Sequence, residues 1–426
     1  MHYLCTRIRE SDAEKGAIAQ LVEHRTENPC VPGSIPGGTT MRRKQMFPLF
    51  CLIRYYLIVS CVFLEAMNEN HNYCVIMAGG IGSRFWPYSR ADRPKQFIDF
   101  FGLGKTLLRQ TYDRFCQIVP KDHIIISTNV AYTSLVLEQL PELDKDLILH
   151  EPAYKRTAPS MALAAYHLRT IDPEACIVMA PIDQFISDER AFRQDILEAL
   201  DYAAQTPHLV TVGIRPTHPE TRYGYIQIDD DSDEIFHKIK TFTEKPQIDF
   251  ARIFVESGEF YWNTGLFVWK ANTIIETMRL LLPDMIAHFD AVFANNPTRD
   301  ERRTDLYRRY ESFPSISVDY AVIEKAPNMY MQVGHYGWVD IGRWEDVYQE
   351  ADKDTYGNAS RYANVEYCNS HNNLVVVPKD KVVVLQDLDG YLVNVTDDVI
   401  VICRRDEDDI RKFRNDVMMK YGKKFM

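Results

Sequence analysis

The sequence predicts an α/β fold built on a mixed, mainly parallel sheet, followed by a small C-terminal β domain. Three observations lead to this prediction. From Tyr73 onward, short apolar runs alternate with longer amphipathic stretches, as strands and helices do in parallel α/β sheets. A glycine-rich turn directly follows the first of these runs. Beyond about Tyr356 the helical patterns fade, and short β-rich runs separated by Lys-Asp, Asp-Gly and Asp-Asp turns replace them.

The composition is that of a folded globular protein. The 426 residues are 46% hydrophobic and 26% charged, which suits one large domain and a smaller one. A formal net charge of −11 argues against a nucleic-acid partner. The nine cysteines include no CxxC pair and no His-Cys cluster, so the sequence predicts neither a zinc site nor a disulfide framework. Reduced thiols favour a cytoplasmic location.

The N-terminal segment differs from the rest of the chain. Residues 14–40 resemble the peptide produced when a transfer-RNA gene is translated by mistake. Residues 46–66 form an apolar run interrupted by Arg54, which formally fits a membrane anchor. We interpret residues 1–66 as a spurious or disordered leader with the natural start at Met67, and we expect no membrane partner. A membrane-tethered protein is the alternative.

The elements of the large domain follow from apolar periodicity. Val75, Ile76 and Met77 form a short apolar run typical of a buried parallel strand. Further strands are predicted at Ile124–Ser127, Ala175–Met179 and Leu209–Gly213. Amphipathic stretches between them predict helices at Leu107–Ile118, Ala158–Thr170 and Glu189–Ala204. Ligands of such sheets bind beyond the carboxyl ends of the strands, where the glycine turn lies.

Longer strands are predicted later in the chain, at Tyr223–Ile228, Phe236–Glu244 and Phe260–Lys270. These strands are expected to pair antiparallel and to form a lip over the sheet, where a ligand could lie. Phe260, Trp262 and Phe267 are predicted to pack in the strand core, because aromatic residues on strands usually do. The change in pattern predicts one domain over residues 67–355 and a small β domain over residues 356–426.

The glycine turn is suited to hold an anion. Gly79, Gly80 and Gly82 let the backbone turn tightly and present N–H groups without an obstructing side chain. The dinucleotide fingerprint GxGxxG would need glycine at Phe85, and a P-loop would need Gly-Lys-Ser/Thr, so neither motif matches. The turn is followed by cations that suit a triphosphate: Arg84, Arg90, Arg93 and Lys95.

The pattern GGxGxRxWPxSRxxxPKQF resembles that of the sugar nucleotidyltransferases. The Trp86-Pro87 pair and the run from Pro94 to Phe97 are most similar to family members that act on GTP and mannose 1-phosphate. Further matching segments extend the resemblance almost to the C-terminus: Glu151–Pro159, Pro181–Ile186, Phe242–Pro246, Trp262–Phe267 and Gly337–Trp344.

The resemblance implies both a fold and a reaction. The fold would combine a Rossmann-like nucleotidyltransferase domain, with a mixed sheet, and a left-handed β-helix-like domain that ends in a helix from Glu407 to about Tyr421. The reaction would be attack by an oxygen of mannose 1-phosphate on the α-phosphorus of GTP, which forms GDP-mannose and releases pyrophosphate. Because two anions must meet, such a site needs cations and a divalent metal.

Four residues are expected to carry the catalysis. Arg84 and Lys95 would bind the β- and γ-phosphates and the leaving pyrophosphate. Asp183 follows the apolar run CIVMAPID, and Asp340 lies in GWVDIGRW. Both carboxylates are the expected ligands of Mg²⁺, because this hard cation prefers oxygen. Gln184 departs from the family pattern, which usually has histidine at that position.

The binding residues come from several segments. Nucleotide contacts are expected from Ala78, Gly79, Gly80, Gly82, Arg84, Lys95, Thr157 and Pro159. Arg156 replaces the asparagine usual in the family, which leaves the guanine preference open, and Thr157 would also serve as the cap of the following helix. Sugar-phosphate contacts are expected from Gly224, Glu244, Lys245 and Asn263.

Two alternatives to this reaction stay open. A related sugar-1-phosphate nucleotidyltransferase would use another base or another hexose. A regulatory subunit would bind a nucleotide sugar without turnover, although the intact cations and carboxylates argue against it. The residues after Tyr356 are few for an additional isomerase domain. The strand edges of the C-terminal β domain are where a homo-oligomer is expected to form.

Overall fold

The computed structural model describes residues 70–80, 82–229, 235–294, 298–361, 364–405 and 410–425. Residues 71–426 belong to one compact unit. The leader expected over residues 1–66 lies outside the described residues and stays a prediction. Within the described part of the chain, no helix combines the length and the apolar character needed to cross a bilayer.

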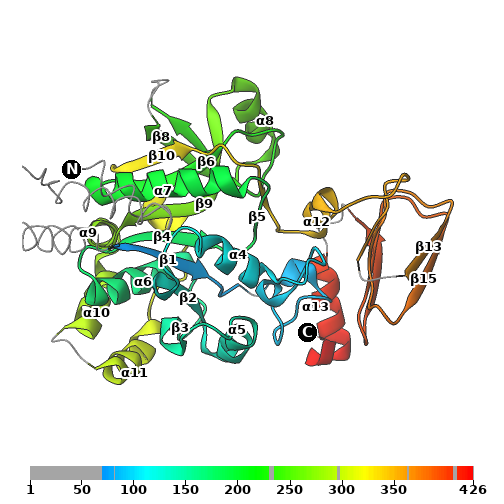
Figure 1. The fold of residues 1–426 in the computed structure, drawn as a ribbon, viewed down its shortest axis with the longest axis horizontal. Coiled ribbons are helices and arrows are strands. Elements are labelled where there is room, and N and C mark those ends of the chain that lie inside the picture. The colour runs from blue at the N-terminus through cyan, green and yellow to red at the C-terminus, as the bar shows by residue number, and fades with distance from the viewer. Residues whose placement is uncertain are drawn as a thin grey trace, which may run out of the picture. The chain divides into compact units, whose positions relative to one another are not determined.

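A mixed nine-stranded sheet forms the centre of this unit, with the strand order β3-β2-β1-β4-β9-β6-β10-β8-β7 (Figure 1). Strands β3, β2, β1 and β4 run parallel, β9 runs antiparallel to both β4 and β6, and β10 runs parallel to β6. The strands are β1 (Asn72–Met77), β2 (Ile124–Asn129), β3 (Ile148–Glu151), β4 (Cys176–Pro181), β6 (Leu209–Ile214), β7 (Gly224–Ile228), β8 (Phe236–Glu244), β9 (Phe260–Lys270) and β10 (Met329–Val333). The predicted α/β fold with a mixed sheet is confirmed.

Helices cover both faces of the sheet. Side chains of β1 alternate between two cores: Cys74 and Ile76 face one, and Tyr73 and Val75 face the other. The first core is completed by α4, α5 and α7, and the second by α6, α9, α10 and α11. The helices are α4 (Leu107–Phe115), α5 (Thr133–Gln139), α6 (Thr157–Ile171), α7 (Glu189–Gln205), α8 (Ile248–Ser257), α9 (Ala271–Leu281), α10 (Pro283–Phe293), α11 (Arg299–Tyr310) and α12 (Trp344–Glu350).

The predicted strands and helices occur close to their expected bounds, but one placement is wrong. Strands β7, β8 and β9 pair antiparallel as expected. However, β9 lies inside the main sheet between β4 and β6, whereas the sequence led us to expect a lip above the sheet. The physical reason is burial on both faces, because Tyr261, Trp262, Phe267 and Val268 are all at most 5% exposed. A strand that is apolar on both faces belongs in the middle of a sheet.

The C-terminal region is rich in strands, as predicted. Strands β12, β14 and β16 form one parallel ladder, which β17 closes antiparallel, and β13 and β15 form a second parallel ladder. Asn373 links successive turns of the chain, because its amide donates to Asn358 Oδ1 at 3.0 Å and accepts from the Tyr391 N–H at 2.9 Å. The strands are β12 (Ala359–Arg361), β13 (Asn364–Cys368), β14 (Leu374–Val376), β15 (Val382–Gln386), β16 (Tyr391–Val395) and β17 (Ile400–Arg404).

The C-terminal helix, α13 (Ile410–Tyr421), returns to the glycine turn. Its expected first residues, 407–409, lie outside the described residues, and its end agrees with the prediction. Figure 1 shows α13 beside the segment that follows β1, and α13 packs against the short 3₁₀ helix η1 (Ser83–Phe85). The Trp86 indole N–H donates to the Phe425 carbonyl at 2.7 Å, which ties the two segments together.

Candidate active site

The glycine turn is fixed from behind by hydrogen bonds to Ala78. The Ala78 N–H donates to the Ser127 carbonyl at 2.8 Å. The Ala78 carbonyl accepts from Gln96 Nε2 at 2.8 Å and from Thr128 Oγ1 at 2.9 Å. These contacts join the end of β1 to β2 and to the 3₁₀ helix η2 (Lys95–Phe97). The turn is therefore held in place by the sheet that carries it.

Gly82 occupies a position that only glycine fits. Its φ angle of 66° lies in the left-handed region. A Cβ atom at Gly82 would lie 2.7 Å from Lys95 Cβ and 2.8 Å from Ser89 Oγ. The missing side chain lets the stem of Lys95 pack directly against the turn.

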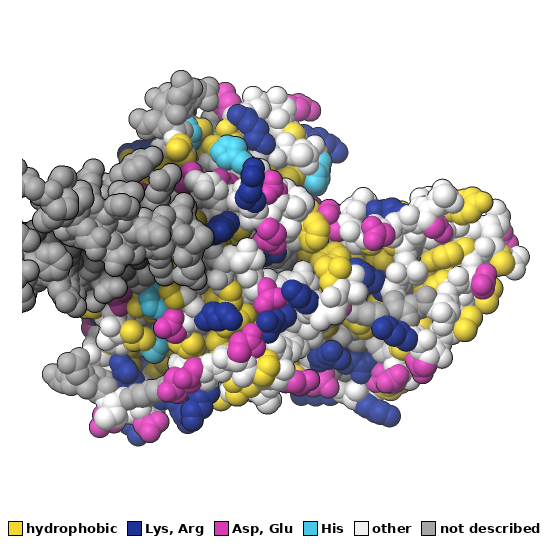
Figure 2. Space-filling view, in the orientation of Figure 1, with side chains coloured by type: hydrophobic (Ala, Val, Ile, Leu, Met, Phe, Trp, Pro, Cys, Tyr) yellow, Lys and Arg dark blue, Asp and Glu magenta, His cyan; other side chains and the backbone are white. Residues whose placement is uncertain are grey.

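A cavity of about 270 Å³ opens beside this turn. Four of the predicted nucleotide-binding residues line it, namely Gly80, Gly82, Arg84 and Lys95. The sequence reasoning missed the other lining residues: Ser83, Phe85, Tyr154, Gly342 and Arg411. Of these, Arg411 comes from α13, and Figure 2 shows Lys and Arg side chains gathered in that part of the molecule.

Two of the predicted phosphate-binding cations do not line the cavity. Arg90 Nη1 donates to Asp398 Oδ2 at 2.8 Å, and Arg90 Nη2 donates to Thr396 Oγ1 at 3.1 Å. Arg90 thus binds the C-terminal strand region, and Arg93 is exposed. A carboxylate far along the chain thus neutralises Arg90, whereas the triphosphate role expected for Arg93 stays a prediction.

Asp183 and Asp340 come together beside Lys95. Asp183 follows β4, and Asp340 ends β11 (Trp338–Asp340), which pairs antiparallel with β5 (Gln184–Ile186). The Ile341 N–H donates to the Asp183 carbonyl at 2.8 Å. Lys95 Nζ forms an ion pair with Asp183, and the two side chains are only 14% and 22% exposed. Three of the four expected catalytic residues therefore form one cluster, next to Arg84 in the cavity wall.

Burial and charge set the protonation of this cluster. Burial is the largest influence on Asp340 and raises its pKa to about 7, Asp183 adds to the rise, and Lys95 opposes it. Burial by itself would lower the pKa of Lys95, but Asp183 and Asp340 outweigh it and the pKa is raised. Lys95 is therefore an ammonium ion, paired with Asp183 and close to Asp340.

The two carboxylates fit a divalent cation. Magnesium is commonly held by one or two carboxylates together with substrate phosphates and water. Among the described residues, no group of three or more His, Cys, Asp or Glu side chains could hold a metal ion. The remaining ligands of such an ion would come from the phosphates and from water.

Gln184, the departure from the family pattern, has a structural contact. Its Nε2 donates to the carbonyl of Thr264 in β9. The side chain is buried, and the residue pairs with Asp340 between β5 and β11. The amide thus ties the strand next to Asp183 to the main sheet.

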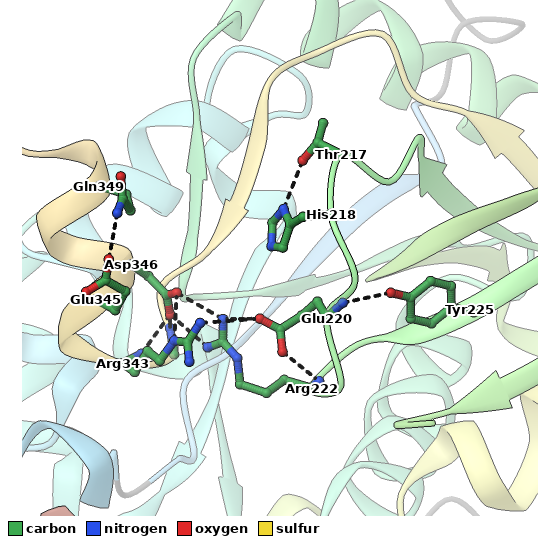
Figure 3. Close-up of polar contacts among 10 residues, drawn as sticks. Thr217, His218, Glu220, Arg222, Tyr225, Arg343, Glu345, Asp346 and Gln349 are labelled. Carbon is green, nitrogen blue, oxygen red and sulfur yellow. Dashed lines mark hydrogen bonds and ion pairs between the residues drawn. The ribbon is translucent and has the colours of Figure 1, made fainter. Parts of the chain in front are cut away.

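An ion-pair network supports the segment that follows Asp340 (Figure 3). Arg222 donates to both carboxylate oxygens of Asp346, at 2.8 and 2.9 Å, and to Glu220 Oε2 at 2.8 Å. Asp346 Oδ2 also accepts from the Gly342 N–H at 3.0 Å. Burial would raise the pKa of Glu220, but Arg222 and Arg343 hold it below its usual value. The network fixes Gly342, which lines the cavity. The ion pairs of Arg222 with Asp346 and Glu220 were not predicted from the sequence.

The predicted sugar-phosphate residues also come together. Gly224 in β7 lies opposite Glu244 in β8 and opposite Asn263 in β9. A Cβ atom at Gly224 would lie 2.7 Å from Glu244 Oε2 and 2.9 Å from Phe242 Cζ, so a side chain there would displace these groups. Lys245 forms an ion pair with Glu244, whose side chain is 6% exposed.

Asp319 joins this group and was missed by the sequence reasoning. It begins the π-helix η6 (Asp319–Ile323), and its Oδ1 accepts from Asn263 Nδ2 at 3.2 Å. Burial raises the pKa of Asp319 to about 6, Glu244 adds to the rise, and Lys245 opposes it. Asp319 lies far from Asn263 in sequence, so no local pattern could have placed the two side chains together.

The predicted base-side residues Thr157 and Pro159 lie in the first turn of α6. Pro159 is buried in α6. Thr157 begins α6, and its hydroxyl accepts from the Val318 N–H at 2.8 Å. The expected cap by Thr157 is wrong, because Arg156 is the N-cap residue and makes no side-chain capping bond.

Glu151 is a buried carboxylate beside the glycine turn that the sequence reasoning did not include among the site residues. Its Oε1 accepts from Ser127 Oγ at 2.9 Å. A Cβ atom at Gly79 would lie 3.5 Å from the same oxygen. Burial raises the pKa of Glu151, and hydrogen bonds from Ser160 and Ser127 partly offset the rise. Within the motif Glu151–Pro159, the sequence drew attention to the later residues only.

Known proteins resemble this chain over most of its length. The nucleotidyl transferase family matches residues 73–357. A mannose-1-phosphate guanylyltransferase of Salmonella muenchen is 35% identical over 338 residues, which are 76% of this chain and 70% of that protein. One from Escherichia coli K12 is 34% identical over 355 residues, 81% of this chain and 73% of that protein.

A solved structure shares the fold as well. It is described as a mannose-1-phosphate geranyltransferase from Thermus thermophilus, and it superposes with a TM-score of 0.72 at 27% identity. The match covers 82% of this chain and 99% of the Thermus chain. The chain therefore belongs to the nucleotidyl transferase family, and within it to the group that contains these mannose-1-phosphate guanylyltransferases.

Proposed function

We propose that this protein is a mannose-1-phosphate guanylyltransferase that converts GTP and mannose 1-phosphate to GDP-mannose and pyrophosphate. One observation carries the proposal. The cavity beside the glycine turn is lined by Arg84 and Lys95, and Lys95 is paired with Asp183 next to Asp340. This is the arrangement of cations and carboxylates that a phosphoryl-type transfer between two anions needs. The names of the relatives supply the substrates.

The residues divide the reaction between them. The backbone N–H groups of the glycine turn and the Arg84 guanidinium bind the β- and γ-phosphates, and Lys95 stabilises the pyrophosphate as it leaves. Mannose 1-phosphate lies over Gly224, where Glu244 and Asn263 bind its hydroxyls and Lys245 pairs with its phosphate. This placement brings the attacking oxygen to the α-phosphorus without a covalent enzyme intermediate.

We assign the divalent metal as Mg²⁺, held by Asp183 and Asp340. Bound there, Mg²⁺ would neutralise the charge of the phosphate oxygens and act as a Lewis acid. The donor set supports the assignment, because two carboxylates leave room for phosphate and water ligands. Lys95 contributes a fixed positive charge to the same cluster, since its pKa is raised by the two carboxylates after burial is overcome.

We assign the base side of the site to the residues from Glu151 to Pro159. Glu151 is its strongest candidate, because a carboxylate accepts hydrogen bonds from the N1–H and N2 amino groups of guanine. Thr157 and Pro159 stay in the proposal as residues that shape the start of α6. The Arg156 and Gln184 departures keep a second candidate in view, namely a related nucleotidyltransferase for another base or hexose.

The remaining assignments concern the whole chain. We infer a catalytic domain over residues 67–355 and a left-handed β-helix over residues 356–426, supported by the two parallel ladders. Exposed apolar side chains on these strands support homo-oligomers formed through this region: Val382, Val384, Ile400 and Ile402. The described cysteines form no disulfide, which supports a cytoplasmic location.

A substrate matrix tests the proposed function. The full chain with Mg²⁺ is assayed for pyrophosphate release with GTP, ATP, UTP and dTTP, each crossed against mannose, glucose and glucosamine 1-phosphates. The proposal predicts activity largely confined to GTP with mannose 1-phosphate. Activity with another pair would keep the reaction type and change the substrates. No release with any pair would favour the regulatory subunit.

A further inference from the structure

We propose that Arg411, in the C-terminal helix α13, is a third phosphate-binding cation of the nucleotide site, beside Arg84 and Lys95. The anion it would bind is the β,γ-diphosphate portion of the nucleoside triphosphate, or free pyrophosphate. The inference rests on the proposed function. The inference extends the proposed function because it gives α13 a role in substrate binding. This helix lies outside the family match, which ends at residue 357.

The position of Arg411 is set by its neighbour in sequence. Ile410 is 5% exposed and belongs to the same apolar core as Phe85 and Trp344. Phe85 directly follows Arg84, and its ring packs edge-on against Trp344 at 5.2 Å. Burial of Ile410 in this core brings Arg411 to the cavity that Arg84 and Lys95 line.

Contacts on both sides of Arg411 in sequence anchor α13. After the helix, the Phe425 carbonyl accepts from the Trp86 indole at 2.7 Å. Before it, Arg405 Nη1 donates to Glu345 Oε1 at 3.0 Å, and its guanidinium stacks 3.3 Å above the Tyr348 ring. Trp86 directly follows the 3₁₀ helix η1, whose residues line the cavity, and α13 itself packs against η1. The packing of α13 therefore determines the position of Arg411.

No described residue provides a charged partner for Arg411. Nearby arginines have carboxylate partners, as Arg90 has Asp398 and Arg405 has Glu345. In the described parts of the chain, Arg411 has no ion pair or hydrogen bond, and its side chain is exposed at the cavity.

The other cations of the cavity do not match the charge of a triphosphate. Besides Arg411, the lining cations are Arg84 and Lys95, and Lys95 is also paired with Asp183. A nucleoside triphosphate carries up to four negative charges, and a planar guanidinium binds two phosphate oxygens at once. An arginine on the solvent side of the cavity is suited to hold the terminal phosphates while the α-phosphorus reacts.

The test compares Arg411→Ala and Arg411→Lys with a matched control, Lys420→Ala. Lys420 is an exposed cation on the same helix, and nine positions at 100° each put it on about the opposite side of α13. All proteins are full-length, and KM is measured separately for GTP, for mannose 1-phosphate and, in the reverse reaction, for pyrophosphate. Melting temperatures check that the variants fold.

We expect Arg411→Ala to raise the KM for GTP and for pyrophosphate by about 10- to 100-fold, the effect of losing one charge-assisted hydrogen bond. The KM for mannose 1-phosphate stays within about twofold, because a sugar-phosphate contact is not lost. Arg411→Lys recovers part of the loss, and Lys420→Ala matches the wild type. Equal KM values for GTP in wild type and Arg411→Ala, with normal melting, would overturn the inference.

Calorimetric binding of GTP and pyrophosphate separates this inference from the proposed function. If the wild type has no turnover but binds pyrophosphate more tightly than Arg411→Ala does, the proposed function fails and the Arg411 site stands. If turnover is normal and pyrophosphate binding is unchanged in Arg411→Ala, the proposed function stands and the Arg411 site fails. If neither protein binds GTP or pyrophosphate, both are wrong.

Discussion

At the scale of single residues, the geometry of the site depends on glycines, because a side chain at some of their positions would collide with neighbouring residues. Gly82 combines a positive φ of 66° with contact to the stem of Lys95, so a side chain there meets two obstacles at once. Gly80 has no positive φ, and a Cβ atom there would have no neighbour within 4 Å. Glycines that look equivalent in the sequence motif therefore have different physical roles.

Gly82→Ala is predicted to destabilise the protein and to displace Lys95. The cost of the left-handed conformation is about 1–3 kcal/mol, and a shift of a catalytic group costs about 100-fold in kcat/KM. Urea unfolding and steady-state kinetics measure the two effects. Gly80→Ala is the control for stability and should unfold at the wild-type urea concentration. Equal stability of the two variants would contradict the prediction.

Lys95→Ala is predicted to lower kcat by about 100- to 1,000-fold, the usual effect of removing one group that stabilises developing charge. The physical reason is the loss of the ammonium ion that is paired with Asp183 and close to Asp340. Initial rates of pyrophosphate release measure it. Lys105→Ala, which removes an exposed lysine paired with Asp113, is the control. A Lys95→Ala protein with normal turnover would refute the catalytic assignment.

Arg156→Gly is predicted to stabilise the fold by about 1 kcal/mol. Arg156 has φ 65° and ψ −163°, a region that glycine adopts readily and other residues do not. Relief of this strain exceeds the extra chain entropy of glycine in the unfolded state. Chemical denaturation measures the gain. Arg156→Ala keeps the Cβ atom and serves as the control, so a gain of equal size in both variants would rule out backbone strain as the cause.

At the scale of elements, long-range contacts join the C-terminal strands and α13 to the segment after the glycine turn. The Arg90 pair with Asp398 is one such contact, and the Trp86 bond to Phe425 is another. The bounds of β8 and β9 were predicted correctly, because local runs of aromatic and β-branched residues define a strand. The position of β9 between β4 and β6 was not predicted, because these pairing partners are distant from β9 in sequence.

Asp398→Asn is predicted to lower stability at pH 7 by less than about 1 kcal/mol, since the pair is partly exposed to solvent. The hydrogen bond from Arg90 is the largest influence on Asp398 and lowers its pKa from 3.8 to about 2. A lowered pKa stabilises the fold above the unfolded pKa, and this contribution is lost as the pH falls through the folded pKa.

The difference between wild type and Asp398→Asn should therefore shrink as the pH falls from about 4 to about 2. Denaturation at a series of pH values measures the trend. Asp397→Asn is the neighbouring control, because the Asp397 side chain is 97% exposed and its partner Lys381 is 3.6 Å away. A difference that grows toward low pH would have the wrong sign for this ion pair.

At the scale of the whole molecule, the compact unit that carries the site begins at His71. Strand β1 starts at Asn72, and the family match starts at residue 73. A protein that begins at Met67 is therefore predicted to have the same kcat and KM values as the full chain and the same melting temperature. Loss of activity or of stability on removal of residues 1–66 would show that the leader matters.

The sequence by itself determined the positions of the strands, the position of the glycine turn and the choice of Asp183 and Asp340 as candidate metal ligands. These predictions depend on local periodicity and on motifs of adjacent residues. Only the tertiary structure decided that Arg90 binds Asp398, that Asp319 joins Asn263 and that Arg411 reaches the cavity. Each of these contacts joins residues far apart along the chain. Their proximity results from packing of whole elements, which no local pattern encodes.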